Sequence, residues 1–237
     1  MSGGMKAAFL VVLVAGLAMA DDRRSGYEFM SRETQAMQDD DTSNPAMLWA
    51  LDGEQLWKAG KPSCASCHAD MKGVAARYPS VNSGRLVNLE QRINLCRTGK
   101  QHAAPLPYES KELLSLSAYI ALQSRGYPIA VQADAAAGKA LYERRQGQLN
   151  LSCAQCHDQY AGKRLGGSTI PQAHPTGYPE YRLEWQTLGS LERRLRNCLI
   201  GIRAEPYPYG APELVELELY LMSRARGMKM DAPGVRP

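Results

Sequence analysis

The chain has 237 residues, of which 44% are hydrophobic and 22% are charged, enough for one large or two small domains with a buried core. The formal net charge of +4 is mild and indicates no nucleic-acid partner. Six cysteines require an explanation by cofactor, metal or disulfide.

The first 20 residues have the pattern of a secretory signal peptide. Lys6 precedes an apolar run from Ala7 to about Leu17, and Ala18-Met19-Ala20 fits a cleavage site of the A-x-A type. Charged residues follow at once, and the run is short for a membrane span. We therefore predict cleavage after residue 20, a periplasmic protein and no stable membrane span in the mature chain. An uncleaved anchor is the alternative.

The next segment, residues 21–43, is polar and acid-rich, and we expect a weakly ordered leader or a strap along the surface. Asn44-Pro45 then has the form of a helix N-cap followed by proline at the first helical position. An apolar stripe at helical spacing continues towards Ala59, and Gly60 ends the predicted helix. This helix leads directly into a cysteine motif.

That motif, Cys64-Ala65-Ser66-Cys67-His68, recurs as Cys153-Ala154-Gln155-Cys156-His157. Cys-x-x-Cys-His is the attachment site of a c-type haem. Its two thiols bond the two vinyl groups on one edge of the porphyrin, and the adjacent histidine reaches the iron. We therefore predict two covalently bound haem c groups. The attaching cysteines and iron-binding histidines are Cys64, Cys67 and His68 in the first motif and Cys153, Cys156 and His157 in the second. A thioredoxin-like redox pair or half of a zinc site is the alternative.

Three segments complete the first unit. Residues 74–84 have no clear period and are expected to form a loop packed over the haem. Residues 88–97 predict a helix that ends at Gly99. After a proline-containing turn, residues 113–123 predict another helix, with Gly126 as its stop.

The pattern then restarts. A helix predicted from residue 133 to about residue 145 leads into the second haem motif. The connection at 161–186 contains glycines and prolines, and we expect it to cover the second haem edge or to meet a partner. Residues 191–198 match residues 89–96 in length and type, and a proline turn and a final helix follow as before.

The sequence therefore contains a tandem duplication. Each unit consists of a helix, a haem motif, a loop, a Leu-Glu-x-Arg-x-x-x-Cys helix, a turn and a helix. We predict an all-α fold made of two cytochrome c-like domains, residues 44–127 and residues 128–227. The second domain is expected to be catalytic, and residues 228–237 are expected to form a short irregular tail.

The two remaining cysteines, Cys96 and Cys198, occupy the same position of the two repeats. A disulfide between equivalent positions of separate domains would be geometrically awkward. Each cysteine is therefore expected to be the sixth ligand of its local haem, and a thiolate there stabilises Fe(III) and predicts a low reduction potential. Histidine and methionine remain alternatives, and the candidates are His102, His174, Met71, Met222, Met228 and Met230.

Arg92 and Arg194 each lie four residues before these cysteines, on the same helical face. A guanidinium there lowers the pKa of the thiol, and a salt bridge to a haem propionate is the alternative. The second site is the more cationic, which suits a small anion, although an ordinary solvated face explains the same residues. The basic residues concerned are Arg193, Arg194, Arg196, Arg203, Lys163 and Arg164.

From about Asn44 to Gly227, these combined motifs resemble the SoxA family, the dihaem subunits of the SoxAX sulfur-oxidation cytochromes. The resemblance implies an L-cysteine S-thiosulfotransferase that pairs with the monohaem cytochrome SoxX. Its members oxidatively couple the sulfane sulfur of thiosulfate to a cysteine of the carrier protein SoxYZ. The resemblance also implies that Cys198 is both iron ligand and catalytic group, that Arg194 helps to hold the anion, and that the haem held by Cys96 is remote from the chemistry.

Two other functions remain open. A dihaem thiosulfate dehydrogenase would couple two thiosulfates to tetrathionate without a carrier protein. A non-enzymatic electron carrier would have two coordinatively saturated haems and no thiosulfate-dependent turnover. An assay without carrier protein separates the first of these from a thiosulfotransferase.

Overall fold

The computed structural model describes residues 21–237. The predicted signal peptide, residues 1–20, lies outside the described residues. Within the described part, no helix has the length and apolar character needed to cross a membrane.

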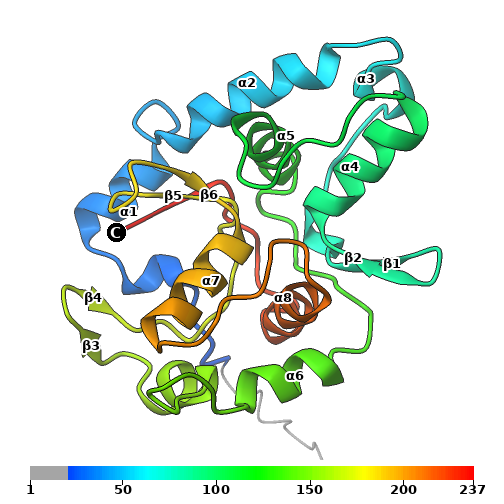
Figure 1. The fold of residues 1–237 in the computed structure, drawn as a ribbon. Helices are drawn as coiled ribbons and strands as arrows, with labels where there is room; N and C mark the ends of the chain where they lie inside the picture. Colours follow the sequence, from blue (N-terminus) through cyan, green and yellow to red (C-terminus); the bar gives the residue numbers. More distant parts are fainter. Residues whose placement is uncertain (1–20) are drawn as a thin grey trace, which may run out of the picture.

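The two repeats share a first helix, a cysteine-motif turn, a hairpin, a cysteine-bearing helix and a last helix in the same order, and the second repeat adds the β3–β4 hairpin (Figure 1). The segment before them contains η1 (Gly26–Phe29) and α1 (Arg32–Asp39). The first repeat contains α2 (Ala46–Lys58), α3 (Cys64–Cys67), η2 (Ala75–Arg77), β1 (Ser80–Asn82), β2 (Arg85–Val87), α4 (Leu89–Lys100) and α5 (Lys111–Leu122). The second contains α6 (Ala136–Glu143), the π-helical turn η3 (Gln155–Gln159), β3 (Arg164–Leu165), β4 (Ser168–Thr169), β5 (Glu180–Arg182), β6 (Thr187–Gly189), α7 (Leu191–Gly201) and α8 (Pro212–Arg224). Strand β7 (Gly234–Arg236) follows them.

The prediction of an all-α fold is wrong, because the helices are accompanied by three small sheets. Strands β1 and β2 form one antiparallel hairpin, and β3 and β4 form a second. The third sheet has the order β6-β5-β7, with β5 antiparallel to β6 and parallel to β7. Strands of two or three residues are too short to show a readable alternation of apolar and polar residues. The segments that contain them were therefore predicted to be loops.

Both cysteine-bearing helices begin at a capped residue. The Asn88 side chain accepts a hydrogen bond from the backbone N–H of Gln91 at 2.9 Å, and the Gln91 side chain accepts one from the Asn88 N–H at 3.3 Å. At the equivalent place Ser190 Oγ accepts a hydrogen bond from the Arg193 N–H at 3.2 Å. These caps satisfy backbone donors that a helix start leaves unpaired. Helix α4 continues through Gly99, the predicted stop, to Lys100.

In each repeat the first helix crosses the last one at a glycine. A Cβ atom at Gly53 of α2 would lie 2.0 Å from the Ser115 carbonyl oxygen of α5, and one at Gly138 of α6 would lie 2.0 Å from the Glu216 carbonyl oxygen of α8. Only glycine permits so close an approach. One turn later an aromatic pair closes each crossing, Trp57 with Tyr119 at 5.8 Å and Tyr142 with Tyr220 at 5.1 Å between ring centroids.

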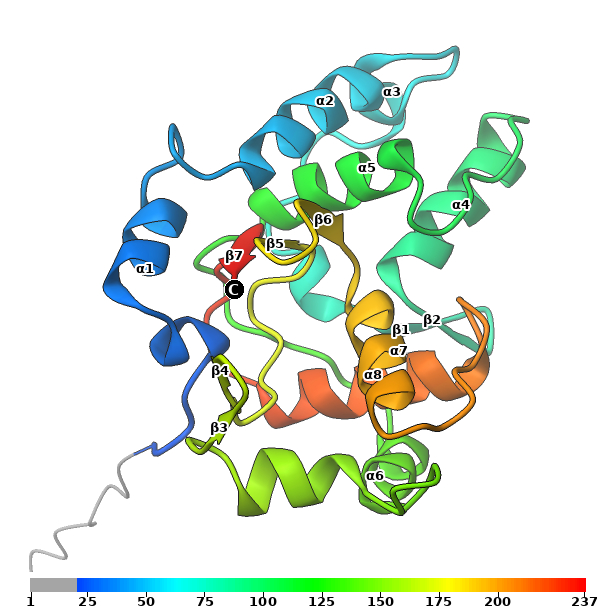
Figure 2. The same ribbon diagram turned by 60° about the vertical axis from the view of Figure 1, so that its left-hand side comes forward.

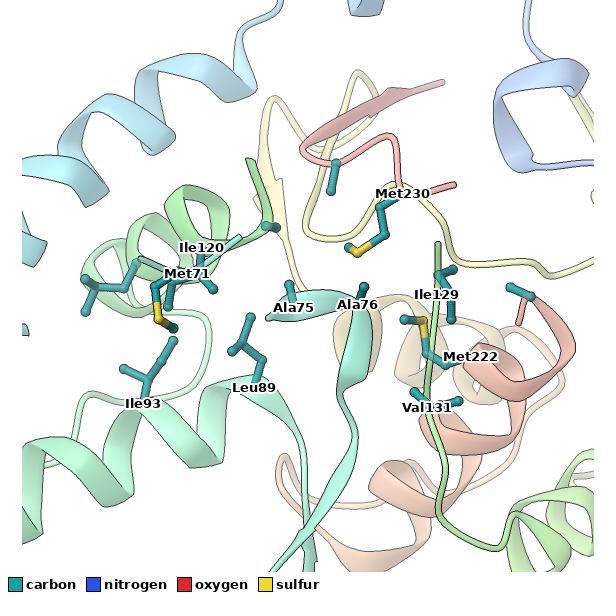
Figure 3. Close-up of a cluster of buried hydrophobic side chains, with 14 of the residues drawn as sticks. Met71, Ala75, Ala76, Leu89, Ile93, Ile120, Ile129, Val131, Met222 and Met230 are labelled. Atoms are coloured by element: carbon teal, nitrogen blue, oxygen red, sulfur yellow. The ribbon is translucent and has the colours of Figure 1, made fainter. Parts of the chain in front are cut away.

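The repeats share an apolar core, and a hairpin of each repeat packs on a helix of the other (Figures 1 and 3). Figure 3 shows Met71 and Ala75 of the first repeat in one cluster with Ile129, Met222 and Met230. Strand β2 contacts α8 of the second repeat. Strand β6 of the second repeat contributes its buried leucine to a cluster with residues of α2 and α5. Each repeat therefore completes the core of the other.

The N-terminal segment packs through α1 against β7, the C-terminal strand of the third sheet (Figure 2). Helix α1 contacts β7, and the Gln38 side chain accepts a hydrogen bond from the Val235 N–H at 2.9 Å. Arg236 is 5% exposed and forms an ion pair with Glu180 of β5 at 3.3 Å. The predicted leader is thus an ordered strap with a helix, and the tail predicted to be irregular forms a buried strand.

Equivalent residues of the two repeats meet at the interface between them. Tyr108 and Tyr209 stack with centroids 5.7 Å apart and an interplanar angle of 14°. Beside them Asn88 Nδ2 donates hydrogen bonds to Glu192 at 2.9 Å and to Glu218 at 3.3 Å. Glu90, the equivalent of Glu192, is also buried. The interface therefore concentrates carboxyl groups in an apolar setting.

Burial raises the pKa of Glu192 to about 8, and repulsion from Glu90 and Glu109 adds to this effect, while the Gly210 N–H and Arg196 oppose it. Burial also raises the pKa values of Glu90 and Glu218. A buried carboxyl group that keeps its proton avoids the cost of an unpaired charge. At neutral pH the interface therefore holds protonated carboxyl groups.

This cluster predicts a pH-dependent stability. Between about pH 4.5 and pH 8 the unfolded chain releases the Glu192 proton while the folded chain keeps it, so the free energy of unfolding falls as pH rises, by about 1.4 kcal/mol per pH unit for one such proton. Glu192→Gln should remove this part of the slope, as measured by urea unfolding across that range. Glu112→Gln, at an exposed position of α5, is the control. Equal slopes in the wild type and Glu192→Gln would contradict the prediction.

Candidate functional site

The second haem motif forms a tight turn that begins at Ser152. Gln155 and Ser152 exchange hydrogen bonds: the Ser152 N–H donates to the Gln155 side chain at 2.9 Å, and the Gln155 N–H donates to Ser152 Oγ at 3.3 Å. The turn brings Cys153, Cys156 and His157 together. His157 Nδ1 lies 2.8 Å from the Pro171 carbonyl oxygen. Because a carbonyl only accepts, Nδ1 carries the proton, and Nε2 keeps the lone pair with which it can bind a metal.

Cys198 of α7 lies beside this turn, close enough to His157 and Arg194 for both to act electrostatically on its thiol. Burial acts to raise the pKa of the Cys198 thiol, but its interaction with His157 and the positive charges of Arg194 and Arg182 outweigh burial, so the pKa is lowered. The site therefore favours a thiolate, the form of cysteine that is both nucleophile and metal ligand.

The first site has the same plan. Ser63 Oγ accepts a hydrogen bond from the Ser66 N–H at 3.1 Å and caps the turn that carries Cys64 and Cys67. Cys96 of α4 is close enough to Cys64 to raise the pKa of that thiol, although burial is the larger cause. The ring of His68 lies 5.6 Å from the Trp57 ring of α2.

The donor set of both sites fits a c-type haem. All six cysteines are free thiols in the described residues, so the disulfide between Cys96 and Cys198 is not formed. Each site presents a Cys-x-x-Cys pair for the porphyrin edge, a histidine, and a further thiol from the neighbouring helix. When bound, haem c supplies a one-electron acceptor at this point.

The alternative sixth ligands lie elsewhere or belong to the core. Met71, Met222 and Met230 are buried in the shared apolar cluster, and Met228 packs against it. His102 is exposed. His174 is buried, and its Nδ1 lies 2.8 Å from the Arg24 carbonyl oxygen of the N-terminal strap. None of these side chains occupies a repeated position, unlike Cys96 and Cys198.

A cavity of about 300 Å³ borders His157. Asp158, the next residue, accepts hydrogen bonds from the Tyr142 hydroxyl at 2.8 Å and from Arg224 Nη2 at 2.7 Å. Arg224 also stacks over the Tyr142 ring, 4.8 Å from its centroid. This network ties the haem motif to α6 and α8. The cavity is lined by Asp22, Arg23, His157, Asp158, Ala161, Gln172, His174 and Arg224.

The predicted cationic rim of Cys198 is smaller than expected. Arg194 is directed to it, but Arg196 stacks over Tyr209 and donates to the Tyr207 carbonyl. Arg193 stacks over Trp185, with its guanidinium carbon 4.3 Å from the ring centroid. The other three basic residues lie in other segments: Lys163 and Arg164 lie at the β3–β4 hairpin, and Arg203 lies in the turn after α7.

The sequence reasoning missed Arg182. This residue is 7% exposed, and it is the second guanidinium, after that of Arg194, to act electrostatically on Cys198. It lies in the segment predicted to be an irregular connection. Tyr78-Pro79 and Tyr178-Pro179 recur before β1 and β5, and aligning them would have placed Arg182 in a repeated hairpin.

Comparisons with known proteins agree over both repeats. A family model described as "SoxA/TsdA, cytochrome c domain" matches residues 52–129 and 137–230. The "L-cysteine S-thiosulfotransferase subunit SoxA" of Rhodovulum sulfidophilum is 36% identical over 91% of this chain and 81% of its own. The protein of the same description from Pseudaminobacter salicylatoxidans is 35% identical, over 91% and 82%. A chain in the crystal structure of SoxXA from P. pantotrophus matches with a TM-score of 0.87 and 32% identity, covering 91% of this chain and 87% of that chain.

The equivalence of Cys96 and Cys198 predicts the effect of a matched pair of substitutions. Cys198→Met should remove the thiolate signature of one ferric haem from the electron paramagnetic resonance spectrum, and Cys96→Met that of the other. Each reduction potential should rise, because a thioether stabilises Fe(III) less than a thiolate. Intact mass checks that both variants keep two haems. An unchanged spectrum in either variant would exclude that cysteine as a ligand.

Proposed function

Because this chain belongs to the SoxA branch of the SoxA/TsdA cytochrome c family, we propose that it catalyses the L-cysteine S-thiosulfotransferase reaction with two covalently bound haem c groups. One observation carries the proposal. In the second repeat the Cys-x-x-Cys-His turn with His157 lies beside Cys198, a cysteine whose thiol pKa is lowered, and the guanidinium of Arg194 acts on that thiol.

The proposed ligand sets follow the repeat. Cys64 and Cys67 attach the first haem, and its iron is held by His68 and Cys96. Cys153 and Cys156 attach the second, and its iron is held by His157 and Cys198. The hydrogen bond from His157 to the Pro171 carbonyl fixes the ring orientation that this ligation needs.

The proposed reaction has two balanced steps. First, the Cys198 thiolate and the sulfane sulfur of thiosulfate form an S–S bond, and the two electrons released pass one at a time to the SoxX cytochrome that is proposed below as the electron acceptor. No bond of thiosulfate breaks. Second, the thiolate of the carrier cysteine attacks that sulfane sulfur, forms a new S–S bond and releases the Cys198 thiolate. The carrier thiol gives up its proton, and the sulfonate leaves with the carrier.

The residues around Cys198 have separate tasks in this scheme. Arg194 is 33% exposed in its side chain, so its guanidinium can meet an anion that arrives from solvent. It holds the sulfonate, and it stabilises the negative charge on the thiolate. Cys198 acts as the nucleophile in the first step and as the leaving group in the second.

The partners are proposed from the relatives. A chain of this kind was solved in SoxXA, so the electron acceptor outside this chain is a SoxX cytochrome in a heterodimer. The cysteine substrate is the carrier protein SoxYZ. Both belong to the periplasm, in agreement with the predicted signal peptide. The first haem is remote from the sulfur chemistry.

The test measures thiosulfate-dependent reduction of the haems with and without carrier protein. Without the carrier we expect reduction by at most one turnover, that is, two electrons for each Cys198. Continued reduction, and a carrier mass increased by the thiosulfonate group, should occur only when the carrier cysteine is present. Cys198→Ser should lower the rate by at least about 100-fold, the order of magnitude for loss of a nucleophile. Cys96→Ser is the matched control and should have a much smaller effect.

Two other results would replace this proposal. Tetrathionate formed from thiosulfate alone would identify a thiosulfate dehydrogenase, which the family description also includes. Haems that accept electrons from a chemical reductant but never from thiosulfate, with or without the carrier, would identify an electron carrier.

A further inference from the structure

We propose that Arg182 is a positioning residue of the Cys198 site, which acts through Glu184 to hold the guanidinium of Arg194 where it binds the sulfonate of thiosulfate. This inference rests on the proposed function and deepens it. It assigns a task to a buried cation that lies outside both haem motifs and outside both cysteine-bearing helices.

The backbone of Arg182 is held from two sides. Strand β5 is the middle strand of its sheet, and Arg182 pairs with Thr187 of β6 and with Arg236 of β7. The next residue, Leu183, donates its N–H to the Arg236 carbonyl at 2.9 Å. A middle strand cannot shift without breaking ladders on both sides. The sheet therefore fixes where the Arg182 side chain starts.

The guanidinium of Arg182 is fixed by two contacts. Its Nε donates to Glu184 Oε1 at 3.0 Å, and its central carbon lies 5.2 Å from the centroid of the Trp185 ring. Arg193 stacks over the same ring at 4.3 Å. The side chain of Arg182 is only 8% exposed, and a buried guanidinium needs such partners because desolvation of an unpaired charge is costly.

Glu184 links the buried guanidinium of Arg182 to the partly exposed guanidinium of Arg194. The same oxygen, Oε1, that accepts from Arg182 lies 3.7 Å from Arg194 Nη1. Two guanidiniums repel each other, and the shared carboxylate holds both in place. The three groups together carry one net positive charge. Both guanidiniums lower the pKa of Cys198, so both lie close enough to the reacting sulfur to act on it electrostatically.

The first repeat lacks this arrangement at corresponding positions. Asn82 takes the place of Arg182, in the same register of the β1–β2 hairpin, opposite Arg85. The β1–β2 turn has two residues, Ser83 and Gly84, where the β5–β6 turn has four, and it contains no carboxylate to match Glu184. That hairpin has two strands, whereas β7 adds a third in the second repeat. Only Arg92, the equivalent of Arg194, is common to both. The cation, the carboxylate and the extra strand thus occur together, and only at the site proposed to bind thiosulfate.

The test compares three variants of the haem-loaded protein as purified. Arg182→Gln removes the buried cation. Glu184→Gln removes the link at a side chain that is half exposed, so folding is not at risk. Arg85→Gln, at an exposed position of the equivalent hairpin, is the control. The readouts are the dissociation constant of thiosulfate by titration calorimetry, KM and kcat with the carrier protein, and the reduction potential of the second haem.

Glu184→Gln separates positioning from bare charge. Loss of a negative charge alone would strengthen anion binding, whereas loss of the link that holds Arg194 should weaken it. We expect both Arg182→Gln and Glu184→Gln to raise the dissociation constant and KM by about tenfold, with a smaller change in kcat. Arg182→Gln should lower the reduction potential of the second haem, and Glu184→Gln should raise it. Arg85→Gln should change none of these.

Two results for thiosulfate binding would overturn the proposal. Tighter thiosulfate binding in Glu184→Gln would show that the carboxylate only opposes the anion. Unchanged binding in Arg182→Gln and Glu184→Gln would show that neither residue serves the site. If Arg182→Gln fails to fold, the dissociation constants of Glu184→Gln and Arg182→Lys test the proposal instead. Lysine keeps the positive charge but loses the planar set of guanidinium donors. A wild-type protein that binds thiosulfate without turning it over would refute the proposed function, while the dissociation constants would still decide the task of Arg182.

Discussion

The close crossing of two helices in each repeat is the contact on which the rest of the structure depends. A glycine in α2 and a glycine in α6 let these helices touch α5 and α8 at backbone distance. Each crossing fixes the point from which the chain turns into its Cys-x-x-Cys-His motif. Because α4 packs on α5 and α7 on α8, the same crossing also sets the distance from each motif to Cys96 or Cys198.

The two repeats form one body because neither buries its own apolar surface alone. The largest buried cluster includes residues of both, and a hairpin of each repeat packs on a helix of the other. At the interface the equivalent residues Glu90 and Glu192 are buried near each other. Their raised pKa values show that apolar packing there outweighs the solvation of carboxylates. The duplication has therefore produced a joint core, with protonated carboxyl groups inside it.

The second repeat differs from the first by additions around one cysteine. Strand β7, against which helix α1 of the N-terminal strap packs, extends its hairpin into a three-stranded sheet, and that sheet carries Arg182. Chemistry on a small dianion needs fixed positive charge, and a middle strand fixes a side chain better than an edge strand. The same scaffold can thus support a haem in both repeats and an anion site in only one.

The sequence by itself identified the residues that are proposed to carry the chemistry. The paired Cys-x-x-Cys-His motifs, the equivalent Cys96 and Cys198, and Arg194 all follow from spacing and duplication, because covalent attachment and ligand reach impose fixed separations along the chain. The principal helices follow from apolar periodicity and caps. Motifs, helical periodicity and caps each involve residues close together in the chain, so they can be recognised in the sequence without knowledge of the tertiary structure.

Only the tertiary structure decided what depends on distant segments. Strand β7 pairs with β5 across about 50 residues of chain, and neither strand is long enough to show a period, so the all-α prediction was wrong. Arg182 has no motif that marks it, and its burial follows from that pairing. Tyr108 stacks on Tyr209, and Gln38 binds Val235, because folding brings together positions whose partners no local pattern specifies.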